Sequence, residues 1–149
     1  MFFLKDLPTQ EILETYHAKF PAMNVKHVDD ALHMLRQASV LMRGLDAYFA
    51  AQGLSQLRYL ILVVLDREPG RNGLLTASEV AARIDVSRPV MTRTLHSLVR
   101  DGWVTMDVHG DDARARLIGL TSAGREKLHQ VLPGFYRVID DFMAAREAD

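Results

Sequence analysis

Cysteine is absent from this chain of 149 residues. Disulfide bonds, cysteine-ligated zinc and thiol-based redox sensing are therefore excluded. Six histidines remain as possible metal ligands, but none of them stands in an HxH or HxxxH spacing. A metal sensor needs clustered ligands. The sequence therefore predicts no metal site and no cofactor.

Long hydrophobic runs are also missing. The longest, Tyr59 to Leu65, is seven residues, whereas a membrane-spanning helix needs roughly 20. The chain starts with Met-Phe-Phe-Leu-Lys-Asp, which lacks the charged segment and sustained apolar stretch of a signal peptide. We expect a cytoplasmic protein.

The motifs of common enzyme classes do not occur either. There is no G-x-S-x-G, no phosphate-binding Walker loop and no dinucleotide-binding glycine pattern. Adjacent aspartates at 29–30 and 140–141 lie in expected helices, where neighbouring side chains diverge by about 100°. We interpret the chain as not an enzyme. A small enzyme stays an alternative that would need an apolar pocket with strongly perturbed titratable groups.

The composition is that of a single globular domain, with 48% hydrophobic and 25% charged residues. The net charge of −1 provides no global attraction for nucleic acid, so DNA binding would need a local basic surface. The segment 87–100 supplies one, because it contains Arg88, Arg93 and Arg100 and no acidic residue. Arginine outnumbers lysine by 14 to 4. This bias suits forked contacts to phosphate and guanine, and equally suits ordinary surface ion pairs.

A long helix dominates the N-terminal third. A short helix over residues 8–20 is expected first, and Pro21 ends it. The long helix then follows Asn24 and ends before Gly53. At ~1.5 Å per residue it is a rod of roughly 40 Å, and it carries two apolar stripes. We expect the stripes to pack against a second subunit; burial within one chain is the alternative.

A third helix is expected from Gln56 to about Arg67, with Ser55 as its N-cap. Its centre is apolar on all sides and would also fit a buried strand. The cap and the following Pro69-Gly70 break favour a buried helix. Leu74-Leu75 is a candidate short strand.

Two short capped helices and a hairpin follow. Thr76-x-x-Glu79 is a capping box, and a second helix follows Ser87, with Pro89 in its first turn and Gly102 at its C-terminus. The second helix is expected to turn Val90, Thr94, Leu95 and Leu98 inward. Strands over 103–108 and 116–120 flank a polar tip, and Thr121 caps a last helix that Pro133 should kink or divide. Two tightly joined helices and a hairpin predict a winged helix-turn-helix, mainly α with a small β-hairpin wing.

Such a unit places its second helix in the major groove of DNA, with the N-terminal residues nearest the bases. Arginine can bond guanine with both prongs, and the helix N-terminus suits a phosphate. The hairpin would be the wing, with Arg114 suited to the narrow minor groove and Asp112 positioning a neighbouring arginine. A solvated helix face and an ordinary charged turn are the alternatives. The residues expected to contact DNA are Ser87, Arg88, Pro89, Thr92, Arg93, Arg114 and Arg116.

Three motifs stand in and around the expected wing: Gly102-Trp103-Val104, Asp112-x-Arg114 and Leu120-Thr121-x-x-Gly124. Together they resemble the wing of MarR-type transcription regulators, and 87–98 is similar to the recognition helix of that family. The resemblance covers roughly residues 24–142. It implies an obligate homodimer that binds a pseudo-palindromic operator on double-stranded DNA. It further implies a repressor released by a small aromatic or anionic effector.

The sequence departs from the family pattern at two places. Met106 stands where an arginine is frequent, so one expected wing or phosphate contact is absent. Only 25 residues follow Gly124, while the N-terminal extension is long, so the helix at 8–20 is expected to replace missing C-terminal turns. We therefore divide the single domain 1–149 into a winged-helix DNA-binding region, 54–120, and a helical dimerisation region, 8–53 with 121–149.

An effector pocket is expected where the long, third and last helices meet. Its predicted lining residues are Arg36, Arg43, Tyr48, Arg58 and Tyr59. Each of them also fits an interface or surface position. A winged helix that binds protein instead of DNA is the alternative function, which the arginine-only segment 87–100 disfavours.

Overall fold

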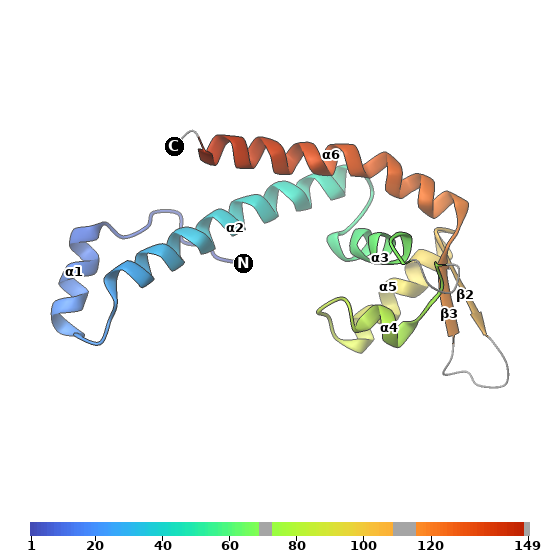
Figure 1. Cartoon of the computed structure of the whole chain (residues 1–149), viewed down its shortest axis with the longest axis horizontal. Coiled ribbons are helices and arrows are strands. Elements are labelled where there is room, and N and C mark those ends of the chain that lie inside the picture. The colour runs from blue at the N-terminus through green and yellow to red at the C-terminus, as the bar shows by residue number, and fades with distance from the viewer. Residues whose placement is uncertain (69–72, 109–115, 148–149) are drawn as a thin grey trace. The chain divides into compact units, whose positions relative to one another are not determined.

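The computed structural model describes residues 1–68, 73–108 and 116–147, and the chain folds as two compact units, Met1–Leu45 and Asp46–Asp149 (Figure 1). Helix α2 (Val25–Ala51) begins in the first unit and ends in the second. The expected division into a DNA-binding region and a dimerisation region stays a prediction.

The first unit consists of an N-terminal segment, α1 (Gln10–Lys19) and most of α2. Thr9 caps α1 by accepting from the Ile12 amide at 3.3 Å, and Asn24 accepts from the His27 amide at 2.9 Å at the start of α2. The N-terminal segment is fixed to α2 because the Phe2 amide donates to the buried Ser39 hydroxyl at 2.8 Å. Both expected helices therefore form, each with a local polar cap.

The second unit has α3 (Gln56–Asp66) at its centre. Ser55 caps α3, and the apolar centre lies in the core, where Ile61 and Leu62 are completely buried. The interpretation of this run as a buried helix is confirmed. Gly53, in the α2–α3 connection, has a φ of +70°, a conformation that glycine adopts without steric cost.

The helix-turn-helix consists of α4 (Ala77–Ala81) and α5 (Arg88–Arg100). Both bonds of the capping box are present: the Glu79 amide donates to the Thr76 hydroxyl, and the Thr76 amide donates to the Glu79 carboxylate. The expected inner face of α5 was partly wrong, because Met91, Leu95 and Leu98 are buried, whereas Val90 and Thr94 are only half-buried. The i, i+4, i+7 spacing places the three buried side chains on one face.

Three strands form an antiparallel sheet in the order β1-β3-β2. Strand β2 is Val104–Val108, β3 is Arg116–Leu120, and the short β1 is Leu75–Thr76. Figure 1 shows the sheet beside α5 and at the start of α6. The fold is thus mainly helical with a wing sheet, as the sequence predicts, and β1 adds a third strand to the expected hairpin.

Helix α6 (Ser122–Glu147) is continuous. The Thr121 hydroxyl accepts from the Gly124 amide at 2.9 Å, which confirms Thr121 as its cap. Pro133 does not divide α6, and the alternative, a kink at this residue, stays a prediction. Pro133 is exposed, and because proline has no amide proton the helix loses one backbone hydrogen bond there.

Within the described ranges, no single helix is long and apolar enough to cross a membrane. Only α2 and α3 taken together, broken at their junction, reach the required length and hydropathy.

Candidate nucleic-acid interface

The N-terminal half of α5 presents a polar surface to solvent. Ser87, Arg88, Pro89, Thr92 and Arg93 are all exposed. The Ser87 side chain makes no capping hydrogen bond, although Ser87 occupies the N-cap position. Its hydroxyl and the free amides of the first turn can therefore donate hydrogen bonds to an external acceptor such as a phosphate. The structure brings these five predicted residues together on one end of one helix.

The opposite face of α5 fixes that surface rigidly. Met91 and Leu95 are buried against the core, so the helix cannot rotate without exposing them. Arg88, Met91 and Thr92 also border a shallow groove of 170 Å³, which α4 lines with Ala77, Ser78 and Ala81. Thr92 and Arg93 therefore project from a helix whose orientation the core determines.

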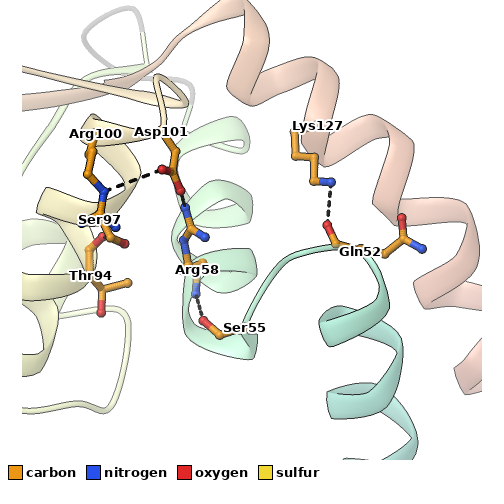
Figure 2. Close-up of polar contacts among 8 residues, drawn as sticks. All are labelled: Gln52, Ser55, Arg58, Thr94, Ser97, Arg100, Asp101 and Lys127. Atoms are coloured by element: carbon orange, nitrogen blue, oxygen red, sulfur yellow. Dashed lines mark hydrogen bonds and ion pairs between the residues drawn. The ribbon is translucent and has the colours of Figure 1, made fainter.

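The C-terminal end of α5 is tied to α3 by an ion pair. The Arg58 guanidinium donates to the Asp101 carboxylate, and Arg100 lies 3.8 Å from the same carboxylate (Figure 2). Arg58 also lies over the Trp103 ring, with its guanidinium carbon 4.7 Å from the ring centroid. The sequence predicted no role for Asp101, because its partner lies 43 residues away.

Trp103 connects this ion pair to α6. Lys127 lies 5.5 Å from the Trp103 ring centroid, and its ammonium group donates to the Gln52 carbonyl at 2.6 Å (Figure 2). The Thr121 amide donates to the Trp103 carbonyl at 3.2 Å. The end of α5, the start of β2 and the start of α6 therefore form one junction around Trp103.

The base of the wing carries Arg116. Its side chain is exposed, and one guanidinium nitrogen lies 3.7 Å from the Met106 sulfur. A cation is thus present beside Met106, the position at which the family frequently has an arginine and this chain has none. Arg114 and Asp112 lie outside the described residues, so their roles stay predictions.

The predicted effector residues belong to two different units of the chain. Arg36 and Arg43 belong to the first unit, where the Arg43 side chain donates to the Ser39 carbonyl at 3.3 Å. Arg58 is directed at Asp101 and Trp103. Their lining of a pocket stays a prediction.

The two tyrosines of that prediction belong to an aromatic cluster. The Tyr59 ring stacks on Phe49 with centroids 4.7 Å apart and lies 4.8 Å from the Phe135 centroid. The Tyr48 hydroxyl donates to the Val131 carbonyl at 2.6 Å. Burial raises the pKa of the Tyr59 phenol to about 12, with smaller contributions from Tyr136 and Tyr48. The cluster joins the end of α2 to α3 and α6.

Among the residues that the structure describes, no group of three or more His, Asp or Glu side chains could hold a metal ion. What the described site offers is a basic, hydrogen-bonding surface on α5 and on the base of the wing. Such a surface can bind an anionic polymer without chemical reaction.

The chain is similar to known regulators over most of its length. Residues 52–115 match the model of the MarR family. The HTH-type transcriptional repressor YetL of Bacillus subtilis is 30% identical over 141 residues, which cover 94% of this chain and 83% of YetL. The transcriptional repressor MprA of Escherichia coli K12 is 25% identical, with 93% of this chain and 77% of MprA covered.

The fold is also found in solved structures. The crystal structure of Sco3205, a MarR family transcriptional regulator from Streptomyces coelicolor in complex with DNA, superposes with a TM-score of 0.75 at 22% identity. The match covers 83% of this chain and 77% of Sco3205. At this identity the likeness shows the fold.

Proposed function

The chain belongs to the MarR family of winged helix-turn-helix transcriptional regulators, and from this premise we propose that it is a homodimeric repressor of a pseudo-palindromic operator. The observation that carries the proposal is the exposed surface of α5, on which Arg88, Thr92 and Arg93 stand free above a buried apolar face. A helix of this kind fits the major groove, and its arginines match guanine. Its place of action is the cytoplasm, where the DNA is accessible.

Two copies of α5 must lie about 34–36 Å apart to read successive major grooves, so the proposal requires a dimer. Large apolar side chains that are exposed in the single chain support one. On the first unit and on α6 these are Met1, Phe3, Leu4, Ile12, Tyr16, Phe20, Met34, Leu35, Val40, Tyr136 and Met143. We assign the dimer contact to 8–53 with 121–149, which includes α1, and the DNA contact to 54–120.

The wing completes the proposed contact. Arg114 enters the minor groove, Arg116 contacts a phosphate, and Asp112 holds a neighbouring arginine in place. Asp112→Ala is expected to weaken binding although it removes a negative charge near DNA. Tighter binding by this variant would show that Asp112 only repels the phosphates.

Selection of bound duplexes from a random pool tests the function. It is expected to yield a two-fold-related sequence with half-sites one helical turn apart. Arg93→Ala should then cost about 1–3 kcal/mol per half-site and relax the preference at one base pair. Lys5→Ala is the matched control, because it removes one positive charge from an exposed residue outside the regions assigned to the dimer and to DNA. The selection could instead enrich no sequence, and Arg93→Ala could bind as the unaltered chain does. That result would contradict sequence-specific recognition of DNA and favour the protein-binding alternative.

We further propose that a small aromatic or anionic effector releases the repressor. The support is that Arg58 belongs to the junction that holds α5, and that its neighbour Tyr59 shares the ring of Phe49 with Tyr48. Arg36 and Arg43 are the additional cations. Linkage requires that operator DNA lowers the affinity for the effector by the factor by which the effector lowers the affinity for DNA. A panel of aromatic carboxylates and phenols, assayed by thermal shift and by gel shift, tests this. If no compound changes either the melting temperature or the gel shift, the proposal that such a compound releases the repressor is wrong.

A further inference from the structure

Lys127, in the second turn of α6, contacts two segments that are distant from it in the sequence. Its ammonium group donates to the Gln52 carbonyl at 2.6 Å (Figure 2). The same group lies 5.5 Å from the centroid of the Trp103 ring, within the range of a cation–π interaction. The Lys127 side chain is only partly exposed, so water competes with these contacts only in part. One side chain therefore links the end of α2 to the residue directly before β2.

The Gln52 carbonyl is the part of α2 that needs an outside donor. Helix α2 ends in a Schellman motif around Gly53, in which the Leu54 amide donates to the Phe49 carbonyl at 2.9 Å. The motif satisfies earlier carbonyls of the last turn, but not that of the C-cap residue, Gln52. A cation at this end of a helix also interacts favourably with the helix dipole. Lys127 therefore fixes the last turn of α2 to α6.

Trp103, the other partner of Lys127, is fixed to the helix-turn-helix and to α6. Its amide donates to the Leu98 carbonyl of α5 at 3.0 Å, and its carbonyl accepts from the Thr121 amide at 3.2 Å. The Arg58 guanidinium carbon lies 4.7 Å from the centroid of its ring. The ring cannot follow a movement of Lys127 without moving the end of α5 as well. Lys127 therefore couples the end of α2 to the position of α5.

This coupling bears on the function proposed above, on which the present inference rests. The dimer contact is assigned in part to α2, whereas α5 is assigned to the major groove. Two copies of α5 must lie one helical turn of DNA apart, so the hold on the end of α2 limits how far the two copies can move. We propose that Lys127 is a positioning residue that determines which spacing of half-sites the dimer accepts.

The test compares two duplexes that contain the half-sites obtained by selection. One has the selected spacing. The other has one additional base pair between the half-sites, which moves one of them by about 3.4 Å and turns it by about 35° around the duplex axis. The unaltered chain is expected to bind the first duplex more tightly.

Lys127→Met keeps the apolar stem but has neither the charge nor the donor. The ratio of its affinities for the two duplexes should be lower than that of the unaltered chain by roughly 2- to 30-fold, the range typical of a residue that couples two sites. A variant that is merely less stable loses affinity for both duplexes alike, so its ratio does not change.

Further variants test the chemistry of the contact. Lys127→Gln, with a shorter and uncharged side chain, should relax the spacing preference as Lys127→Met does. Lys127→Arg, which retains the charge and the donors, should restore at least part of the preference. Lys5→Met is the matched control, because it removes a lysine charge from an exposed residue outside the regions assigned to the dimer and to DNA. Its ratio should equal that of the unaltered chain.

Fluorescence reports on the contact without DNA, because Trp103 is the sole tryptophan of the chain. Removing the ammonium group from beside the ring should change the emission of Lys127→Met relative to the unaltered chain and to Lys5→Met. Unchanged emission would overturn the contact, and the positioning role with it.

The outcomes separate this inference from the proposed function. Equal ratios for Lys127→Met and the unaltered chain would overturn the positioning role. The same holds if the unaltered chain accepts both spacings equally, or if Lys127→Arg relaxes the preference as fully as Lys127→Met. In these cases the proposed function would stand, because the half-sites are still recognised. Failure of the unaltered chain to enrich any two-fold-related sequence would overturn the proposed function and this inference together.

Discussion

Arg58, in the first turn of α3, and Asp101, at the C-terminal cap of α5, form an ion pair that links the third helix to the end of the proposed recognition helix (Figure 2). The Arg58 side chain is 18% exposed, and its Nε atom is buried without a hydrogen-bond partner among the described residues. The same guanidinium stacks on Trp103, at the start of the wing sheet. One side chain thus fixes the end of α5 and the start of β2 against α3.

Removing either partner should lower stability and loosen α5. Asp101→Asn or Arg58→Met is expected to cost about 1–2 kcal/mol, between the values for exposed and for buried pairs, since Asp101 is partly exposed. Urea unfolding measures this, and the cost of the double variant should be smaller than the sum of the two single costs. DNA affinity should fall without a change in the salt slope, because no phosphate contact is removed. Unchanged affinity would limit the pair to a role in stability.

Gly124 should not tolerate a methyl group. A Cβ atom at this position would overlap the Trp103 carbonyl, which is backbone and cannot move aside like a side chain. In an exposed helix, Gly→Ala stabilises the protein by about 1 kcal/mol. At Gly124 we expect the opposite, a loss of stability. Gly102→Ala is the comparison: its Cβ meets no atom within 4 Å, and only its φ of +76° carries a cost, of about 1–2 kcal/mol. Thermal unfolding that ranks Gly124→Ala as the more stable of the two would contradict this packing.

Leu35→Asp should dissociate the proposed dimer. Leu35 is 48% exposed in the single chain, so the fold of one chain does not depend on it, whereas a dimer interface would. Sedimentation is expected to show a folded monomer for Leu35→Asp. Ser78→Asp is the control, since it adds an acid at an exposed residue of α4, outside the region assigned to the dimer. A monomer for the unaltered chain at micromolar concentration would disprove the dimer.

Tyr59 should titrate late, because burial raises its phenol pKa from 10.0 to about 12. The unfolded chain loses this proton at lower pH than the folded chain. The stability that the buried, protonated Tyr59 phenol contributes is therefore fully present below about pH 10. It is lost as the pH rises toward 12. Ultraviolet titration of the folded protein should show a late phenolate step that is missing in Tyr59→Phe. Identical curves for the two proteins would contradict the burial of this hydroxyl.

Local signals in the sequence predicted most of the elements correctly. The Thr76–Glu79 capping box, Thr121 at the start of α6 and Gly102 after α5 each act within a few residues. Their geometry therefore follows from the chain itself and needs no knowledge of the rest of the fold. The same holds for the exposed polar side of α5, which the helical period determines once its ends are known.

Tertiary structure decided the contacts between distant segments. The pairing of Arg58 with Asp101, the bond from Tyr48 to Val131 and the addition of β1 to β3 join residues that no local pattern connects. Nothing near Arg58 in the sequence indicates that an acidic residue on another helix pairs with it. Such partners become defined only when the packing of apolar faces has positioned the helices, since burial is non-directional and fixes no individual polar pair in advance.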